Sequence, residues 1–298
     1  MRKLILTVLV SLLLISSVSA SDLLGYWNFD ETSGSTAYDS SGLGNDGALL
    51  NMTDANWVSG KFGNGLDFNR TLEQHVNFGE PSSLKPEEYS ISLWFKADDL
   101  EGQDYSILID KGLWNNNGYS LYLYNDSSDE REIWFSVYRV DGSPSGSGCH
   151  VGSPDEAFKI GNWSHVVGTY NGTNIILYVN GSQVASDTCT YYPMKYNGSE
   201  NVILAGLEDD VVFFDGIMDE LKIYNRSLTD TEVNNLYLYN YLTAPIPQPV
   251  TETMEDVGAG VGGLLSGMGT PLTVLIILLG VASAFGFVLA TIGKGLMA

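Results

Sequence analysis

Hydrophobic and polar positions alternate over short runs in the middle of the chain, from residue 21 to about residue 242. Residues 90–95 alternate small polar with large apolar side chains, apart from Trp94, and residues 119–124 and 133–138 repeat the pattern with many aromatic residues. A period of two indicates strands with one buried face, and strands favour aromatic residues. Clusters of Gly, Asn, Asp and Ser separate the runs, which favours an all-β sandwich over alternating βα units.

Two Asn-Gly pairs separate three apolar runs between residues 163 and 186. They are Asn171-Gly172 and Asn180-Gly181. Asn-Gly supplies the two positive-φ residues of a tight type I′ turn, so this stretch predicts an antiparallel meander.

A short helix is predicted after the last apolar run, which covers residues 217–224. Thr229 and Glu232 have the spacing of a capping box, which places a helix from there to about Tyr239.

The two ends of the chain differ from its middle. Arg2 and Lys3 precede an apolar run over residues 4–15, and small residues follow as far as Ala20. This pattern is typical of a secretory signal peptide over residues 1–20, with cleavage after Ala20, so we expect an exported protein.

A second apolar stretch covers residues 272–292 without a charged residue. At about 1.5 Å per residue a helix of this length crosses a hydrocarbon core of about 30 Å, so we expect a single transmembrane helix. Lys294, in the short tail 293–298, favours an N-terminal domain outside the membrane. The domain then sits on a cell surface or a virion envelope.

Two segments connect the sandwich to this helix. Residues 243–256 form a Pro-rich, acidic linker, and residues 257–271 form a Gly-rich juxtamembrane segment. Small residues at spacings of four let helices pack closely, so the Gly-rich segment with the helix is either a face for self-association or, in its first part, a flexible spacer.

The charge balance is strongly acidic, with a formal net charge of −22. This excludes nucleic acid as an expected partner, because phosphate binding needs stripes of Lys and Arg. Cys149 and Cys189 are the only cysteines. In an exported domain they predict one disulfide, with two free thiols as the alternative. Two cysteines and the scattered His75, His150 and His165 argue against a zinc site.

Seven motifs in series resemble a known family. They lie at residues 25–31 (GYWNFDE), 39–47 (DSSGLGNDG), 60–68 (GKFGNGLDF), 91–95 (ISLWF), 163–170 (WSHVVGTY), 178–181 (YVNG) and 216–226 (GIMDELKIYNR). In this order they are similar to the laminin G-like jelly-roll branch of the concanavalin A-like lectin/glucanase superfamily. The resemblance covers residues 21–242 and implies a two-sheet antiparallel jelly-roll sandwich.

The resemblance also implies a calcium site. Members of this family often bind one structural Ca²⁺ through carboxylates of the first and last strands and an intervening loop, which correspond here to Asp30, Asn45, Asp46 and Asp219, with Asp39 as a weaker candidate. Calcium takes six to eight oxygen ligands, so these residue types suit it. The alternative is that Asp30 and Asp46 only make side-chain bonds within turns.

Enzymatic activity is not expected. Some relatives of this fold hydrolyse glycans with a Glu-x-Asp-x-x-Glu strand, and that spacing lies on none of the strands predicted here. Residues 129–132 read as a solvated turn, and strand alternation places Asp219 and Glu220 on opposite faces. His165 reads as an ordinary wall residue of a strand.

A binding module is the favoured hypothesis, because sugar sites combine aromatic rings with a few polar groups. Each aromatic candidate has an equal alternative as a core residue. The candidates are Trp114, Tyr122, Tyr124, Trp134, Tyr138, Tyr191 and Tyr192.

Sequons for N-glycosylation are more frequent than composition predicts. They begin at Asn51, Asn69, Asn125, Asn162, Asn171, Asn180, Asn197 and Asn225. We therefore expect a membrane-anchored extracellular protein that recognises carbohydrate or a surface partner. The alternatives are a structural coat or virion-envelope protein and, third, a glycoside hydrolase.

Overall fold

The computed structural model describes residues 22–100, 104–112, 118–125, 131–138, 148–189, 196, 200–207 and 212–240. The predicted signal peptide, linker, Gly-rich segment, transmembrane helix and tail lie outside these residues. Within the described ranges, no helix has the length and apolarity needed to cross a membrane.

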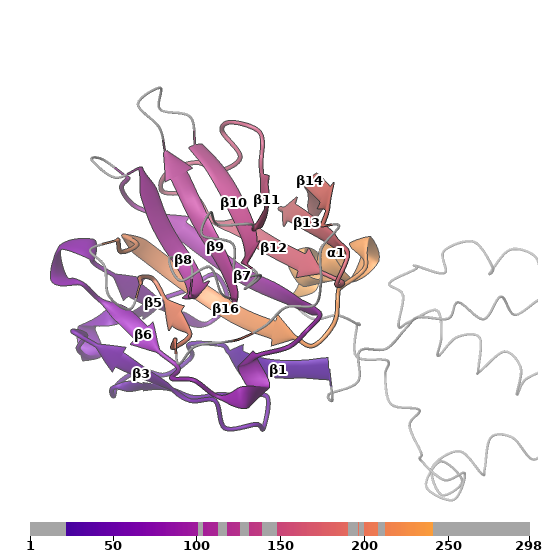
Figure 1. The fold of residues 1–298 in the computed structure, drawn as a ribbon. Coiled ribbons are helices and arrows are strands. Elements are labelled where there is room, and N and C mark those ends of the chain that lie inside the picture. The colour runs from indigo at the N-terminus through magenta and orange to yellow at the C-terminus, as the bar shows by residue number, and fades with distance from the viewer. Residues whose placement is uncertain are drawn as a thin grey trace, which may run out of the picture. The chain divides into compact units, whose positions relative to one another are not determined.

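The described strands form two antiparallel sheets that pack as a jelly-roll-like sandwich (Figure 1), as the sequence predicts. Sheet A contains β1 (Leu23–Trp27), β4 (Trp57–Ser59), β5 (Asn64–Phe68), β7 (Tyr89–Ala97), β12 (Ser164–Tyr170), β13 (Asn174–Val179), β14 (Ser182–Thr188) and β16 (Gly216–Tyr224). Sheet B contains β2 (Thr36–Ala37), β3 (Gly47–Leu50), β6 (His75–Asn77), β8 (Tyr105–Lys111), β9 (Gly118–Asn125), β10 (Arg131–Tyr138), β11 (Cys149–Gly152) and β15 (Ile203–Leu204). The helical segments are η2 (Asp54–Asn56), η3 (Arg70–Leu72), η4 (Ser82–Leu84) and α1 (Asp230–Tyr239).

The order of the strands brings distant parts of the chain together. Sheet A runs β14-β13-β12-β7-β16-β5-β4, and β1 pairs with β16, so the first and last strands are neighbours. Sheet B runs β11-β10-β9-β8-β15-β6-β3-β2.

The core fills the space between the sheets with one face of each strand. Ile91, Leu93 and Phe95 of β7 meet Leu121 and Leu123 of β9, and all five side chains are fully buried. The alternation read from the sequence is therefore the alternation between the core and the outer faces.

Strands β12, β13 and β14 form the predicted meander, but its two turns differ. Asn180 and Gly181 have φ angles of 49° and 78°, as a type I′ turn requires. The same prediction for Asn171 is wrong, because only Gly172 of that pair has positive φ. Asn171 Oδ1 instead accepts the backbone N–H groups of the two residues that begin at Thr173, so side-chain bonds shape a longer connection.

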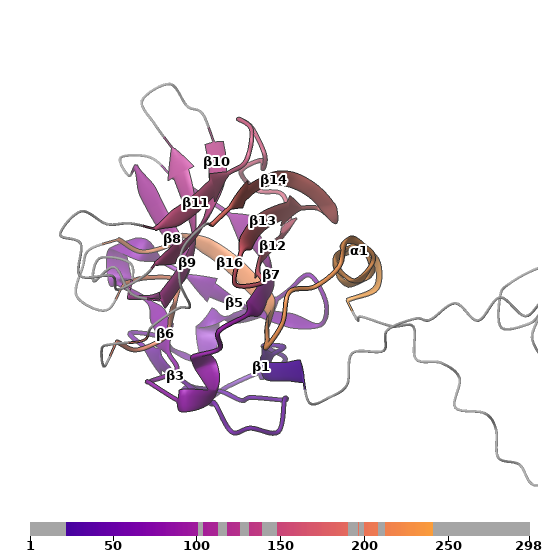
Figure 2. The ribbon, with the colours of Figure 1, turned by 45° about the vertical axis from the view of Figure 1, so that its right-hand side comes forward.

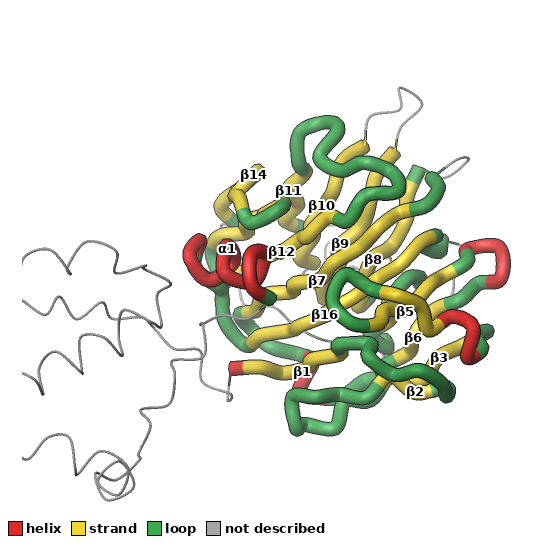
Figure 3. Tube along the Cα trace, turned by 180° about the vertical axis from the view of Figure 1, so that it is seen from behind, coloured by secondary structure: helices red, strands yellow, loops and turns green. Residues whose placement is uncertain are grey.

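Helix α1 covers part of the outer face of sheet A, on the side turned away from sheet B (Figures 2 and 3). Val233 and Leu236 of the helix pack on Val167 and Tyr178 of the sheet. The predicted capping box is present: the Thr229 hydroxyl and the Glu232 side chain cap each other's backbone N–H groups.

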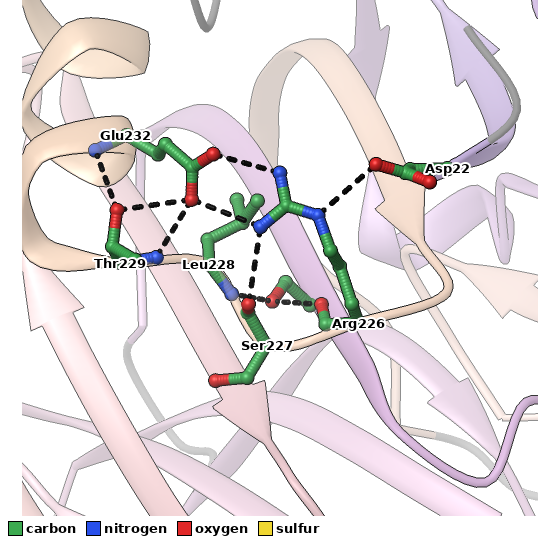
Figure 4. A network of polar contacts seen from close by, with 7 residues as sticks. Asp22, Arg226, Ser227, Leu228, Thr229 and Glu232 are labelled. Atoms are coloured by element: carbon green, nitrogen blue, oxygen red, sulfur yellow. Dashed lines mark hydrogen bonds and ion pairs between the residues drawn. The ribbon is translucent and has the colours of Figure 1, made fainter. Parts of the chain in front are cut away.

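One arginine joins this helix to the residue that precedes β1 (Figure 4). The Arg226 guanidinium donates to Glu232 Oε1 at 2.7 Å and Oε2 at 2.9 Å, and its Nε donates to Asp22 Oδ2 at 3.1 Å. The Leu228 N–H donates to Ser90 Oγ, which fixes the connection between β16 and α1.

Candidate functional site

The outer face of sheet B carries an aromatic surface built from alternate residues of adjacent strands. Tyr122 of β9 and Trp134 of β10 are direct register partners, and their rings lie nearly parallel, with centroids 6.5 Å apart and 11° between planes. Tyr105 of β8 lies beside them, 5.9 Å from the Tyr122 ring and 5.3 Å from the Tyr124 ring.

These rings enclose a pocket of about 350 Å³. It is lined by Tyr105, Tyr122, Tyr124, Trp134 and His150. The sequence predicts three of the five, and each of those three occupies an outward position on β9 or β10. Tyr105 and His150 were missed, because their place beside the others depends on how β8 and β11 pair with the central strands.

Polar groups fix the orientation of the rings. Trp134 Nε1 donates to Glu132 Oε2 at 2.7 Å, and Ser136 Oγ lies 2.8 Å from His150 Nδ1. Gly152 stands opposite Trp134, and a Cβ atom built there would lie 2.6 Å from the indole ring. The absence of a side chain at Gly152 thus makes room for Trp134.

The other predicted aromatic residues divide into two groups. Tyr138 is on the same face but is only 8 % exposed and belongs to a buried cluster with Ile107, Tyr122 and Leu207, so it does not line the pocket. Trp114, Tyr191 and Tyr192 lie outside the described residues.

Two of the predicted calcium ligands meet at the hairpin between β4 and β5. Asp219 Oδ2 accepts the backbone N–H groups of Lys61 and Phe62, at 2.8 and 2.9 Å. Asp30 Oδ1 accepts the N–H of Asn64 at 2.9 Å. The carboxylates of Asp30, which follows β1, and of Asp219, in β16, therefore both accept backbone N–H groups of the same hairpin.

The other predicted ligands bond elsewhere. Asn45 Oδ1 accepts from the Ser83 hydroxyl, and Asp46 Oδ1 accepts the N–H of Asp39. Asp39 itself accepts the N–H groups of Tyr26 and Asn45, among others, and so organises its loop.

A match to a family model over much of the described sandwich shows the family of the chain. A family model described as the concanavalin A-like lectin/glucanases superfamily matches residues 69–234, more than half of the chain. The chain belongs to this superfamily. The three motifs that precede residue 69 lie in strands or loops of the same sandwich.

Solved structures share the superfamily fold at low sequence identity. Domain 4 of AbnA, a GH43 extracellular arabinanase from Geobacillus stearothermophilus in complex with arabinotriose, is 20 % identical, with a TM-score of 0.53, over 72 % of this chain and 98 % of that one. The binding domain of Paraclostridial Mosquitocidal Protein 1 is 15 % identical, with a TM-score of 0.57, over 73 % and 52 %. The binding domain of botulinum neurotoxin DC in complex with SialylT is 15 % identical, with a TM-score of 0.52, over 76 % and 52 %. The chain spans about half the length of these two toxin domains. A comparison with curated proteins found no match.

The calcium ion that the superfamily implies can be tested against the donor atoms. A calcium site needs six to eight oxygens, whereas most carboxylate and amide oxygens of the predicted ligands already accept hydrogen bonds. Asp219 Oδ1 differs from these, because it is buried and lacks a hydrogen-bond donor of good geometry. The described residues contain no group of three His, Cys, Asp or Glu side chains arranged to hold a metal. The calcium site stays a prediction, and Asp219 is the predicted ligand with a buried oxygen that accepts no hydrogen bond of good geometry.

Asp219 and Glu220 do not point to opposite faces, and that prediction is wrong. Glu220 has a φ of 57° within an irregularity of the β16–β7 register, which interrupts the alternation. Glu220 pairs with Lys222 at 2.6 Å, and both carboxylates contribute to raising the pKa of Tyr26, after the larger effect of burial. Both therefore lie on the outer face of sheet A.

His165 is buried on this face, in agreement with its interpretation as a wall residue. Its Nε2 lies 2.9 Å from Ser92 Oγ, and the rings of Trp94 and Tyr237 pack against it.

The sequons lie mostly on exposed asparagines. Asn125 is half-buried, and Asn197 lies outside the described residues. The exposed ones are Asn51, Asn69, Asn162, Asn171, Asn180 and Asn225. The disulfide between Cys149 and Cys189 is formed, as predicted.

Proposed function

We propose that the protein binds carbohydrate through the aromatic pocket on the outer face of sheet B, as an exported protein held to a membrane by its C-terminal helix. The observation that carries the proposal is the set of four aromatic rings around one pocket, with an imidazole at its edge. Aromatic rings stack on sugar rings, and a few fixed polar groups select their hydroxyls.

Two structural neighbours support the ligand class. One was solved with arabinotriose and another with SialylT. These ligands are known for those two proteins, and the shared fold does not show where this chain would bind a sugar. The local support is the ring geometry, in which Trp134 and Tyr122 line the pocket with nearly parallel ring planes.

The test is glycan-array binding by the full chain in detergent, displayed multivalently. Trp134→Ala should weaken binding to the glycans that score by about tenfold or more, because a lost aromatic contact is worth ~1–2 kcal/mol. Trp134→Phe should lose less, since it keeps a ring in place.

Tyr38→Ala is the matched control, because Tyr38 is 59 % exposed and follows β2, at the opposite edge of sheet B from β11. It should bind like the parent chain. Equal losses in both alanine variants, or silence from a demonstrably folded chain, would reject the proposed site. Silence would then favour a protein-binding or structural coat role.

Calcium is part of the same proposal, because members of the family often bind one Ca²⁺ and the buried Asp219 Oδ1 lacks a hydrogen-bond donor of good geometry. Repeating the array in chelator decides whether binding requires the ion. Binding that survives chelation keeps the carbohydrate site and removes calcium from it.

A further inference from the structure

The aromatic pocket has no positive side chain among the residues that line it. The lining is Tyr105, Tyr122, Tyr124, Trp134 and His150. Burial lowers the pKa of His150, so its ring is uncharged at neutral pH. Lysine or arginine would be needed to hold a carboxylate or sulfate strongly.

Negative charge lies directly beside the pocket. Glu132 accepts the Trp134 Nε1–H bond at 2.7 Å, which keeps its carboxylate next to the indole. Burial raises the pKa of the Tyr122 hydroxyl, and the charge of Glu132 adds to that rise. The carboxylate is therefore close enough to act electrostatically on a group in the wall of the pocket.

A second carboxylate lies on the same face. Asp110 of β8 is the register partner of Ser120, and Ser120 pairs with Ser136, which bonds to His150. Asp110 is 4 % exposed and contributes to raising the pKa of Tyr138, which belongs to the same cluster as Tyr122. Glu132 thus lies directly beside a lining residue of the pocket, and Asp110 lies farther along the same face, outside the lining.

The nearest cation along β10 is Arg131. Arg131 immediately precedes Glu132, so alternation directs its side chain toward the other face of the sheet. The whole chain carries a net charge of −22, which adds a long-range repulsion toward anions.

We propose that this pocket selects uncharged glycans and discriminates against sialylated, sulfated or uronic-acid glycans. This inference rests on the proposed function, because it specifies the ligand class of the same site. A neutral sugar would lose only water on entering, whereas an anionic sugar would bring a like charge beside Glu132 in a partly desolvated place.

The experiment uses the full chain in detergent on an array of matched glycan pairs, each present with and without a terminal sialic acid or sulfate, at 150 mM salt. The charged member of each pair should bind about tenfold more weakly or worse. Raising the salt to 0.5 M should reduce this difference in affinity between the neutral and charged members of a pair, because salt screens the repulsion.

Glu132→Gln isolates the charge. Its side-chain carbonyl can still accept the Trp134 bond, so the indole keeps an acceptor, and the difference in affinity between the neutral and charged members of each glycan pair should shrink. Glu88→Gln, at an exposed position before β7 in the other sheet, is the matched control and should leave this difference unchanged.

The outcomes separate the two claims. If charged glycans bind as well as their neutral partners or better, the selection for neutral ligands is overturned and the carbohydrate site stands. If the affinity difference within glycan pairs is as large in Glu132→Gln as in Glu88→Gln, the charge of Glu132 does not cause the selection, and the inference fails. If the folded chain binds neither member of any pair, the proposed function itself fails.

Discussion

His165 illustrates how a single buried residue couples the fold to pH. The side chain is 1 % exposed, bonds to the Ser92 hydroxyl, and is enclosed by the Trp94 and Tyr237 rings. Burial lowers its pKa to about 3, helped by the charges of Lys222 and Lys61. The native state therefore holds the neutral ring.

Acidification should destabilise the protein through this residue. In the unfolded chain a histidine takes up a proton near pH 6.5, whereas folded His165 does not until about pH 3. Its contribution to stability is complete above pH 6.5 and is lost as the pH falls below that value, by up to ~1.4 kcal/mol per pH unit. Denaturant unfolding at pH 7.5, 6 and 5 measures this slope.

His165→Gln is the comparison, because it removes the titrating ring and keeps a polar side chain. Whatever its stability at pH 7.5, its loss between pH 6.5 and 5 should be smaller than that of the parent chain. Parallel curves would show that His165 is not the group responsible.

At the scale of single residues, the sequence pattern predicts part of the candidate site. Alternation along β9 and β10 is enough to place Tyr122, Tyr124 and Trp134 on one outward face. It does not reveal Tyr105 or His150, because each joins the pocket only through pairing with a strand elsewhere in the chain. Side-chain bonds that cross long stretches of chain, such as those of Asn45 to Leu24 and Ser83, are equally invisible to it.

Among the elements, α1 depends on a charged network more than on its own length. A helix of 10 residues is marginal alone, so its capping box and its contacts with sheet A hold it. Arg226 bridges Glu232 of the capping box and Asp22, which immediately precedes β1. The Glu232 side chain is 5 % exposed, so loss of the arginine would leave a buried carboxylate with fewer donors.

Arg226→Met should destabilise the protein by ~1–3 kcal/mol, because a charge-assisted pair with a buried acid is broken. A double-mutant cycle with Glu232→Gln should give a coupling of ~1–2 kcal/mol in denaturant unfolding. The Arg70–Asp99 pair serves as the control, since its aspartate is 44 % exposed, and its cycle should give less than ~1 kcal/mol. Equal couplings in the two cycles would contradict the role given to Arg226.

Local sequence predicts elements well where turn chemistry and caps decide them. Thr229 and Glu232 fix the start of α1, and Asn180-Gly181 fixes a tight turn. It fails at Asn171, where local side-chain bonds to the N–H groups of Thr173 and Asn174 accompany a backbone turn bond and give a longer connection. It also fails at Glu220, because an irregularity in β16 turns its carboxylate to the side of Asp219.

For the whole molecule, the order of the strands was beyond local reasoning. Periodicity predicts strands but not which strands pair. The two-sheet jelly roll, in which β1 pairs with β16, could be expected only from the resemblance of seven motifs to a family. The disulfide belongs to this scale as well, because Cys149 begins β11 at the edge of sheet B and Cys189 follows β14 at the edge of sheet A.

Removing that disulfide should affect both stability and the proposed site. It joins cysteines 40 residues apart, for which loop-closure entropy gives a stabilisation of roughly 4 kcal/mol. We expect the Cys149→Ser/Cys189→Ser variant to unfold at correspondingly lower denaturant concentration. Its affinity for glycan should also fall, by less than about tenfold. The loss is expected because β11, with His150, loses its link to sheet A, and it is limited because Trp134 and Tyr122 stay on central strands. The parent chain under reducing conditions should reproduce both changes. Stability lost without any change in affinity would show that the disulfide serves the sandwich alone, and unchanged stability would show that the packing of the two sheet edges suffices without the bond.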